Sequence, residues 1–205
     1  MNLHFCTRDY LEKKLKRLGV SLTPLIMLAF EQAEKSHAHQ KRDDGSSYLE
    51  QHIYPVTDNL IDFCIAERKK ITEELVIGSL LHDALEDDSS LSHHKFKKNF
   101  GLKIFKIVHP LTKTFSGKMS KQKRRAYNQL YFAKLEASPW ETKVIKLADR
   151  FNNISSIHVT PKKDKLARYI EETIEFYLPF AERVSAYFYV KIRDKLAELE
   201  ALLNH

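Results

Sequence analysis

The stretch that decides the fold is Leu75-Val76-Ile77-Gly78-Ser79-Leu80-Leu81-His82-Asp83-Ala84-Leu85-Glu86-Asp87. In it an apolar run leads directly into four ionisable side chains, those of His82, Asp83, Glu86 and Asp87. A buried charge needs a partner or a metal ion. His82 and Asp83 lie about 100° apart around a helix, and Glu86 and Asp87 follow on the same face one turn later. The stretch therefore predicts a helix that carries a metal site. The alternative is a helix with an ordinary acidic end, although acids at a helix C-terminus oppose the helix dipole.

Outside this stretch, the chain is poor in turn residues and rich in helix formers. It has only 5 glycines and 6 prolines among 205 residues, and Thr23-Pro24 is typical of a helix start. Residues 40–51 are polar and are interpreted as a loop. No run is typical of a strand, so we predict an all-α protein. The expected helices cover 8–18, 24–36, 53–67, 72–87, 93–109, 120–137, 140–157, 164–177 and 179–203.

Length and composition favour one domain, which we place at residues 1–205. The chain is 43% hydrophobic, which is enough for a sizeable core, and has no linker or internal repeat. The first residues lack the apolar segment of a secretory signal, and the longest uncharged run, Leu18 to Phe30, is too short to span a bilayer. Cys6 and Cys64 have no metal-type spacing. We expect reduced thiols, no membrane segment and a cytoplasmic location.

The formal net charge is +7 and the sequence pI is about 9.2. A basic chain favours acidic partners, which include nucleic acid, an anionic membrane and a polyphosphate ligand. Composition does not choose among them.

Two further segments add candidate metal ligands. His52 follows the polar loop at the start of an apolar helix, where a plain core histidine is the alternative. Asp149 follows the apolar run Val144 to Ala148, where a buried salt bridge with Arg150 or a lysine is the alternative. Two imidazoles and two carboxylates suit a divalent ion with open positions for water. Manganese fits this set best, and iron, zinc and magnesium stay open. Glu86 and Asp87 are then candidates for proton transfer.

The order of these motifs is similar to that of a known family. It runs from Arg42, Gly45, Tyr48 and His52 through the His82-Asp83-x-x-Glu86-Asp87 motif to Leu147-Ala148-Asp149-Arg150-x-x-Asn153. Further likeness lies at Phe100-Gly101, Leu111-Thr112-Lys113 and Glu172 to Ala181. Over roughly residues 25 to 185 the chain resembles the hydrolase domain of the RelA/SpoT alarmone enzymes, part of the HD superfamily. The resemblance implies a single-domain HD-superfamily helical bundle, with a C-terminal helix at 179–203. The nucleotide synthetase domain of that family has no room in this chain, so we expect a stand-alone small alarmone hydrolase.

The resemblance also implies an activity and a role for each residue. The activity is Mn²⁺-dependent removal of the 3′-pyrophosphate from guanosine 3′,5′-bispyrophosphate-type alarmones, which releases pyrophosphate and GDP or GTP. The metal ligands are His52, His82, Asp83 and Asp149, and the acidic pair beside the attacking water is Glu86 and Asp87. For the substrate the resemblance implies contacts with Arg42, which stacks on the base, and with Asn153, Ser156 and Lys113. Basic residues that could also meet phosphates are Lys118, Lys121, Lys123, Arg124 and Arg125, and a solvated basic helix start is their alternative.

Two positions depart from the family pattern. Asp43 stands where a basic residue usually follows the stacking arginine, and Tyr48 and His52 are four residues apart instead of three, with Ser47 where proline is common. These changes leave the metal set intact but affect the loop that would meet base and phosphate. There, Arg42 has the alternative of pairing with Asp43 or Asp44.

Three other functions stay open. The first is an HD phosphohydrolase for another nucleotide, such as an adenosine alarmone, NADPH or a deoxynucleotide. The second is a nucleotide-sensing module without catalysis, against which the intact Glu86 and Asp87 argue. The third is an RNA- or DNA-binding helical protein, but the basic residues are spread along the chain and no recognised nucleic-acid motif appears. We therefore expect an acidic nucleotide, and not a nucleic acid, as the partner.

Overall fold

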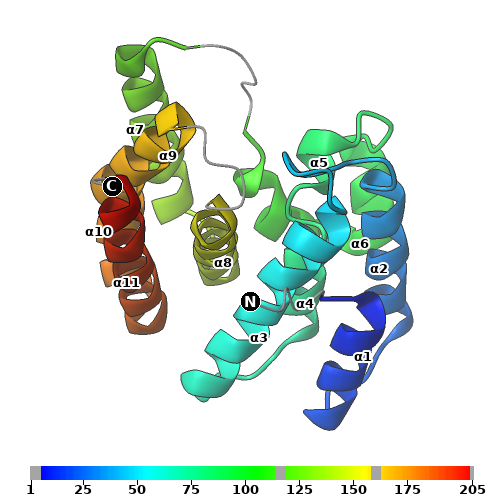
Figure 1. Cartoon of the computed structure of the whole chain (residues 1–205). Helices are drawn as coiled ribbons and strands as arrows, with labels where there is room; N and C mark the ends of the chain where they lie inside the picture. Colours follow the sequence, from blue (N-terminus) through cyan, green and yellow to red (C-terminus); the bar gives the residue numbers. More distant parts are fainter. Residues whose placement is uncertain (1–5, 114–118, 158–162, 204–205) are drawn as a thin grey trace.

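The computed structural model describes residues 6–113, 119–157 and 163–203, and these residues form an all-α fold (Figure 1). The described ranges contain no strand, only an isolated antiparallel bridge between Lys41 and Ser47. The α-helices are α1 (Arg8–Arg17), α2 (Pro24–Ser36), α3 (Tyr54–Ala66), α4 (Glu73–Leu80), α5 (Ala84–Asp87), α6 (His93–Val108), α7 (Lys121–Glu136), α8 (Trp140–Ser156), α9 (Lys163–Glu172), α10 (Leu178–Val184) and α11 (Ala186–Leu203). Short π or 3₁₀ turns are η1 (Leu49–Ile53), η2 (His109–Leu111) and η4 (Thr173–Tyr177).

Side-chain caps fix where several helices begin. The hydroxyl groups of Thr7, Thr23, Thr72, Ser92 and Ser120 each accept a hydrogen bond from the backbone N–H three residues later. Each hydroxyl satisfies one of the donors that a helix start leaves unpaired. The predicted start of α2 at Thr23-Pro24 is confirmed.

Helix α8 lies in the middle of the fold, with α3 and α4 on one side and α10 and α11 on the other (Figure 1). Gly78 in α4 permits the close approach of α4 to α8. A Cβ atom built there would lie 2.9 Å from Ile145 Cδ1 and 3.0 Å from Ile107 Cγ2, so even alanine would displace these core side chains. Helices α3, α4 and α8 all pack against one another in the core.

The prediction of a single helix over 72–87 is wrong. Helix α4 ends at Leu80, residues 81–83 form a turn, and the short α5 begins at Ala84. His82 explains the break, because its Nδ1 lies 2.7 Å from the Ser79 carbonyl oxygen. In a continuous helix that carbonyl would accept from the N–H of residue 83. The ring therefore takes the place of a helical hydrogen bond and turns the chain.

Four other boundaries differ from the sequence prediction. The expected helix 179–203 is split at Ser185, whose extended backbone (φ −159°) ends α10 and whose hydroxyl accepts from Phe188 N–H at 3.2 Å. Gly101, at φ +79°, kinks α6 inside the expected helix 93–109. The last residues of the expected loop 40–51 belong to η1, and the expected helix 164–177 is α9 followed by η4. Lys118 lies outside the described residues.

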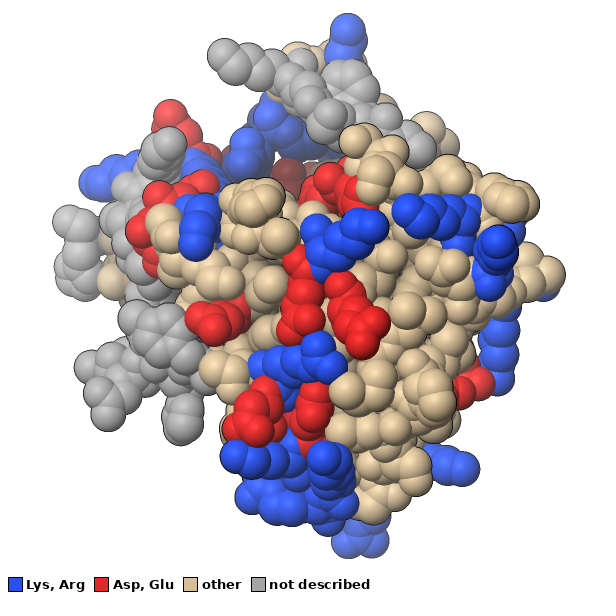
Figure 2. Space-filling model, turned by 90° about the vertical axis from the view of Figure 1, so that its right-hand side faces the viewer, with Lys and Arg blue, Asp and Glu red and all other residues tan. Residues whose placement is uncertain are grey.

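The surface on the side of α1 and α2 carries cations and carboxylates side by side (Figure 2). Lys14 contacts Asp58 at 2.6 Å and Asp62 at 2.5 Å, and Arg8 contacts Glu12 at 2.7 Å and Glu34 at 2.9 Å. Many charges of this face are therefore held in ion pairs. Among the described residues, no helix is both long and apolar enough to cross a membrane.

Candidate active site

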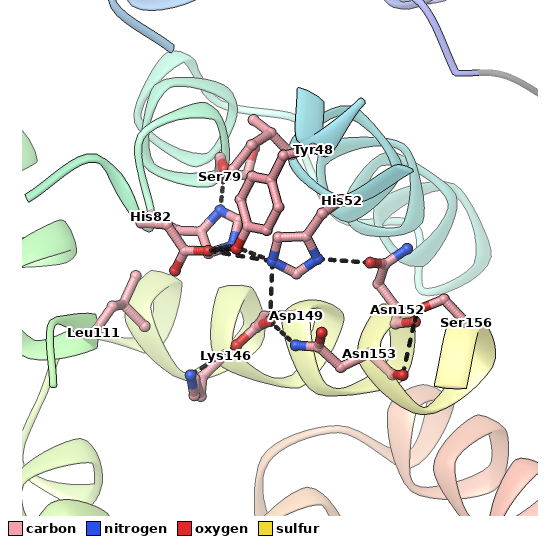
Figure 3. Close-up of polar contacts among 12 residues, drawn as sticks. Tyr48, His52, Ser79, His82, Leu111, Lys146, Asp149, Asn152, Asn153 and Ser156 are labelled. Carbon is pink, nitrogen blue, oxygen red and sulfur yellow. Dashed lines mark hydrogen bonds and ion pairs between the residues drawn. The ribbon is translucent and has the colours of Figure 1, made fainter. Parts of the chain in front are cut away.

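His52 in η1, His82 in the α4–α5 turn and Asp149 in α8 lie close together (Figure 3), and Asp83 follows His82 in the same turn. His52 Nε2 lies 3.2 Å from His82 Nε2 and 3.2 Å from Asp83 Oδ2. His82 Nε2 lies 3.3 Å from the same Asp83 oxygen, and Asp149 Oδ1 lies 3.5 Å from His52 Nε2. Residues separated by nearly one hundred positions in the sequence thus face one small volume.

The outer nitrogens of both imidazoles are held by carbonyl oxygens. His82 Nδ1 lies 2.7 Å from the backbone oxygen of Ser79, and His52 Nδ1 lies 2.7 Å from the side-chain oxygen of Asn152. A carbonyl oxygen only accepts, so each Nδ1 carries a proton and each ring turns its Nε2 toward the other ring. Such outer hydrogen bonds are the usual way in which metal-binding histidines are oriented.

This donor set fits a divalent cation. The Nε2 atoms of His52 and His82 and an oxygen of Asp83 lie within 4.8 Å of one another, and Asp149 Oδ1 lies beside His52. Without a cation or proton between them, their lone pairs and charges would repel. Donors at about 2.1 Å from one ion lie roughly 3.0–3.4 Å from each other, which matches the separations of 3.2–3.3 Å among His52, His82 and Asp83. Although burial favours the neutral ring, the Asp83 and Asp149 carboxylates raise the pKa of His82 to about 9. The volume therefore attracts positive charge.

Two neighbouring side chains orient the carboxylates. Lys146 Nζ donates to Asp149 Oδ2 at 2.7 Å, and the hydroxyl of Tyr48 donates to Asp83 Oδ2 at 2.6 Å. Burial by itself would raise the pKa of both aspartates. Lys146 and His52 keep the pKa of Asp149 below its usual value, and His82 and His52 keep the pKa of Asp83 well below. Both groups therefore stay ionised and ready to bind a cation.

Glu86 and Asp87 lie at the edge of this site with access to solvent. Glu86 Oε2 accepts from the backbone N–H of Lys113 at 2.9 Å, and Asp87 Oδ2 accepts from Gln40 Nε2 at 3.0 Å. Desolvation raises the pKa of each carboxyl group, and the charge of Asp83 adds to the effect. A carboxyl group with a raised pKa beside a metal site suits proton transfer near neutral pH.

Arg42, Asn153 and Ser156 come together beside the metal ligands. The guanidinium of Arg42 donates to Ser156 Oγ at 2.8 Å and to Asn153 Oδ1 at 3.4 Å. Together with Tyr48, Lys165 and others, these three residues line a cavity of about 140 Å³. Asn153 Nδ2 also donates to Asp149 Oδ1 at 2.5 Å, which joins this cavity to the metal site.

A larger hollow of about 720 Å³ is lined by Asp149 and shares Asn153 and Tyr169 with the Arg42 cavity. Its lining contains more cations than carboxylates, namely Lys113, Arg124, Lys146, Arg150 and Arg168 against Asp149 and Glu172. Lys113 and Arg124 are therefore the predicted basic residues that face it. By contrast, Lys121 pairs with Glu171 at 3.0 Å and Arg125 pairs with Glu175, both on the exposed surface.

Sequence reasoning did not single out several residues of this site. No role was predicted from the sequence for Lys146 or Asn152. Each lies three residues from Asp149 on α8, a spacing that makes it a neighbour of Asp149 on the helix surface. The sequence motif contained Tyr48 without giving it a role. His37 and Gln40 precede the expected loop or lie at its start, and nothing in their spacing points to Asp87.

Residues 29–186, more than half of the chain, match the family model described as HD domain. The chain belongs to the HD domain family. Its fold is therefore the all-α HD fold, and the members of this family are metal-dependent hydrolases.

The relatives of this HD domain include alarmone enzymes. The chain is 30% identical over 162 residues to the guanosine-3′,5′-bis(diphosphate) 3′-pyrophosphohydrolase of Aquifex aeolicus, covering 79% of the chain and 22% of the relative. It is 30% identical over 202 residues to a probable enzyme of the same name from Mycoplasma pneumoniae, covering 94% of the chain and 26% of the relative. The chain thus spans about a quarter of the length of these relatives.

A solved structure also resembles this HD domain. It is described as a metazoan ortholog of SpoT that hydrolyses ppGpp and plays a role in starvation responses. The TM-score is 0.69 at 21% identity, and the match covers 86% of the chain and 96% of the solved chain. This likeness supports the fold.

Proposed function

We propose that this HD domain hydrolyses the 3′-pyrophosphate of guanosine 3′,5′-bispyrophosphate-type nucleotides, releasing pyrophosphate and GDP or GTP. One observation carries the proposal: the metal-binding donors and the Arg42 cavity are joined through Asn153, which contacts both Arg42 and Asp149. A nucleotide whose base lies in the cavity would bring its ribose phosphate to the metal donors. The names of the Aquifex and Mycoplasma relatives support the same substrate.

In this proposal His52, His82, Asp83 and Asp149 hold one divalent ion. Mn²⁺ is the ion that we propose, because a mixed set of imidazoles and carboxylates suits it. When bound, such an ion lowers the pKa of a water molecule and polarises a phosphoryl oxygen. The remaining chemistry belongs to the side chains around it.

The reaction joins a water oxygen to the phosphorus nearest the ribose and breaks the bond from that phosphorus to the 3′ oxygen. One proton leaves the water, and one proton reaches the 3′ oxygen. Glu86 and Asp87 are the groups that we assign to these transfers, because both have raised pKa values and lie one turn beyond Asp83. The cations around the larger hollow, Lys113, Arg124 and Arg168, suit the negative charge of the phosphates.

The experiment incubates the Mn²⁺-loaded protein separately with guanosine and adenosine 3′,5′-bispyrophosphates, NADPH and a deoxynucleoside triphosphate. Chromatography and ³¹P NMR identify the products, and Asp83→Ala serves as the control. We expect GDP and intact pyrophosphate from the guanosine substrate. Orthophosphate as the first product, or no turnover of the guanosine substrate beside turnover of another nucleotide, would refute the proposal. The same assay with Mn²⁺, Mg²⁺, Zn²⁺ and Fe²⁺ tests the choice of ion.

We also propose the cytoplasm as the location of the protein. Cys6 and Cys64 are both buried free thiols, and burial raises the pKa of Cys64 to about 11. Thiols of this kind agree with a reducing compartment. Fractionation of cells with an antibody against the chain would test the location.

A further inference from the structure

The end of α2 meets the end of α5 at a seam close to the metal donors. His37 follows α2, and its Nδ1 lies 2.6 Å from the side-chain oxygen of Gln40. The amide nitrogen of Gln40 donates to Asp87 Oδ2 at 3.0 Å. His37 Nδ1 itself lies 3.7 Å from the same carboxylate oxygen. An imidazole, an amide and a carboxylate thus form one short chain of contacts.

The direction of these hydrogen bonds follows from the carboxylate. An ionised carboxylate only accepts, so the amide of Gln40 turns its nitrogen to Asp87 and its oxygen to His37. His37 must then carry its proton on Nδ1. Burial lowers the pKa of His37 and keeps the ring neutral, which agrees with a ring that donates from Nδ1 and leaves Nε2 bare.

The Nε2 atom of His37 lowers the stability of the folded state. This atom is buried and has no hydrogen-bond partner among the described residues, and a buried polar atom without a partner destabilises the folded state. The ring also packs against Tyr48, with centroids 5.3 Å apart, and Tyr48 donates to Asp83. An apolar side chain would pack there without that cost but could not hold Gln40.

We propose that Gln40, held by His37, is a positioning residue that fixes the Asp87 carboxylate toward the metal donors. This inference rests on the proposed function, in which Asp87 takes part in proton transfer. Asp87 lies at a solvent-accessible edge where a free side chain could adopt several rotamers. A fixed donor restricts it to the rotamer that faces the reacting water, and only interactions held in the productive geometry raise the rate.

The neighbouring residue pair offers a matched control. Ser36, at the end of the same helix, donates its hydroxyl to Asp88 Oδ2 at 2.9 Å across the same seam. Asp88 follows Asp87, and its hydrogen bonds are with Ser36, Gln32 and Ser90, none of which is a proposed metal ligand. Ser36→Ala therefore removes a similar hydrogen bond without touching Asp87.

The test compares Gln40→Met, Ser36→Ala, Asp87→Asn and the double variant Gln40→Met/Asp87→Asn in the Mn²⁺-loaded protein. Methionine has a similar length but no amide, so we expect kcat to fall about tenfold, as for the loss of one hydrogen bond to a charged group. The KM should change less than about twofold, and Ser36→Ala should change neither. In the double variant the Gln40 effect should vanish, because it acts through Asp87. Unchanged kcat in Gln40→Met beside an impaired Asp87→Asn, or additive losses, would overturn the inference alone.

A second readout does not depend on turnover. Besides burial, the titratable groups that act on the Asp87 carboxyl are Asp83, His37 and His82, and the hydrogen bond from Gln40 lowers the pKa of Asp87. Carboxyl ¹³C NMR should therefore record a higher Asp87 pKa in Gln40→Met and an unaltered one in Ser36→Ala. An unaltered value in both overturns the inference even if the wild-type protein hydrolyses the alarmone. If the Asp87 pKa is higher in Gln40→Met but the wild-type protein hydrolyses no alarmone, Gln40 still positions Asp87. In that case only the proposed function is refuted.

Discussion

Lys146 donates to Asp149 at 2.7 Å across one turn of α8, and both side chains are less than a tenth exposed. The ammonium also lies 5.6 Å from the centre of the Tyr131 ring. Burial alone would lower its pKa, but Asp149 together with Tyr131 and Tyr177 raises the pKa of Lys146 well above the usual value. The salt bridge expected as an alternative for Asp149 thus exists beside the metal-site geometry. The partner is Lys146, while Arg150 donates to Thr173 and to the backbone oxygen of Tyr169.

The first prediction concerns the stability that this pair contributes. Lys146→Met keeps the length of the side chain but leaves a buried carboxylate with one cation fewer. Removal of one partner from a buried pair typically costs about 3–5 kcal/mol. We expect a loss of this order in urea unfolding of the chelator-treated protein. With Mn²⁺ present the loss should be smaller, since a bound ion compensates Asp149. An equal loss in both conditions would argue that Asp149 does not bind the ion.

The second prediction concerns the metal itself. Chelation should abolish hydrolysis, and added Mn²⁺ should restore it. Asp83→Ala removes the oxygen that lies within 3.3 Å of both imidazole nitrogens, so bound manganese measured by mass spectrometry should fall together with activity. Asp62→Ala, an exposed carboxylate that pairs with Lys14, is the control and should retain both. Full activity of Asp83→Ala in metal-free buffer would contradict the assigned site.

The third prediction separates proton transfer from metal binding. Glu86 is held by the Lys113 N–H and not by the metal donors, and its pKa is raised. Glu86→Gln preserves shape and hydrogen bonding but cannot exchange a proton. Loss of a general acid or base typically lowers the rate about 10²–10⁴-fold. We expect a fall of this size in kcat with unchanged manganese content, and a parallel fall in metal content would reassign Glu86 as a ligand.

The sequence predicted the all-α fold and most helix positions, and it named candidate metal ligands, for two physical reasons. Helix starts are encoded locally. At the start of α2, Thr23 supplies the cap and the ring of Pro24 fixes the backbone φ angle of the first helical residue. His52, His82 and Asp83 could be expected to converge because each ionisable group stands beside an apolar run and would otherwise be buried without compensation; their group contacts Asp149 through His52. The roles assigned to these residues remain predictions that the experiments above address.

Other features depend on contacts that no local pattern encodes. The break at residues 81–83 arises from a ring that takes a backbone carbonyl, which helical periodicity does not include. Asn152 becomes important only because α8 passes beside His52. Gln40 reaches Asp87 across 47 positions of sequence, through the packing of α2 against α5. Tertiary hydrogen bonds of this kind are decided by the fold after the helices are in place.

The fourth prediction is a pH dependence of stability. Burial lowers the pKa of His37 below its ordinary value of 6.5, so the folded state binds fewer protons than the unfolded chain. Stability is therefore lost as the pH falls below about 6.5. His37→Gln removes this group, and between pH 7.5 and 5.5 it should lose less stability than the wild type in urea unfolding at constant chelator concentration. Identical losses would show that the ring accepts a proton in the folded state.

The last prediction concerns Arg42 and the departure at Asp43. The Arg42 guanidinium reaches across to α8, where it donates to Ser156 and Asn153, and its carbon lies 5.8 Å from the centre of the Tyr48 ring. Asp43 forms an ion pair with Lys165 of α9. Asp43 and its partner Lys165 both line the same cavity as Arg42.

A guanidinium held in this way presents a flat, permanently charged face to the cavity. Stacking of a base on it contributes roughly 0.5–2 kcal/mol, which corresponds to about two- to thirtyfold in affinity at about 1.4 kcal/mol per decade. Every base has such a face, so stacking alone does not select guanine over adenine. We therefore expect Arg42→Ala to raise KM severalfold for both purine alarmones, with a smaller loss in kcat. Lys165→Ala should have less effect on KM, because Lys165 pairs with Asp43 at the rim. Steady-state kinetics with both substrates decide the matter: an unchanged KM in Arg42→Ala for both would mean that Arg42 serves only to join the loop to Ser156 and Asn153.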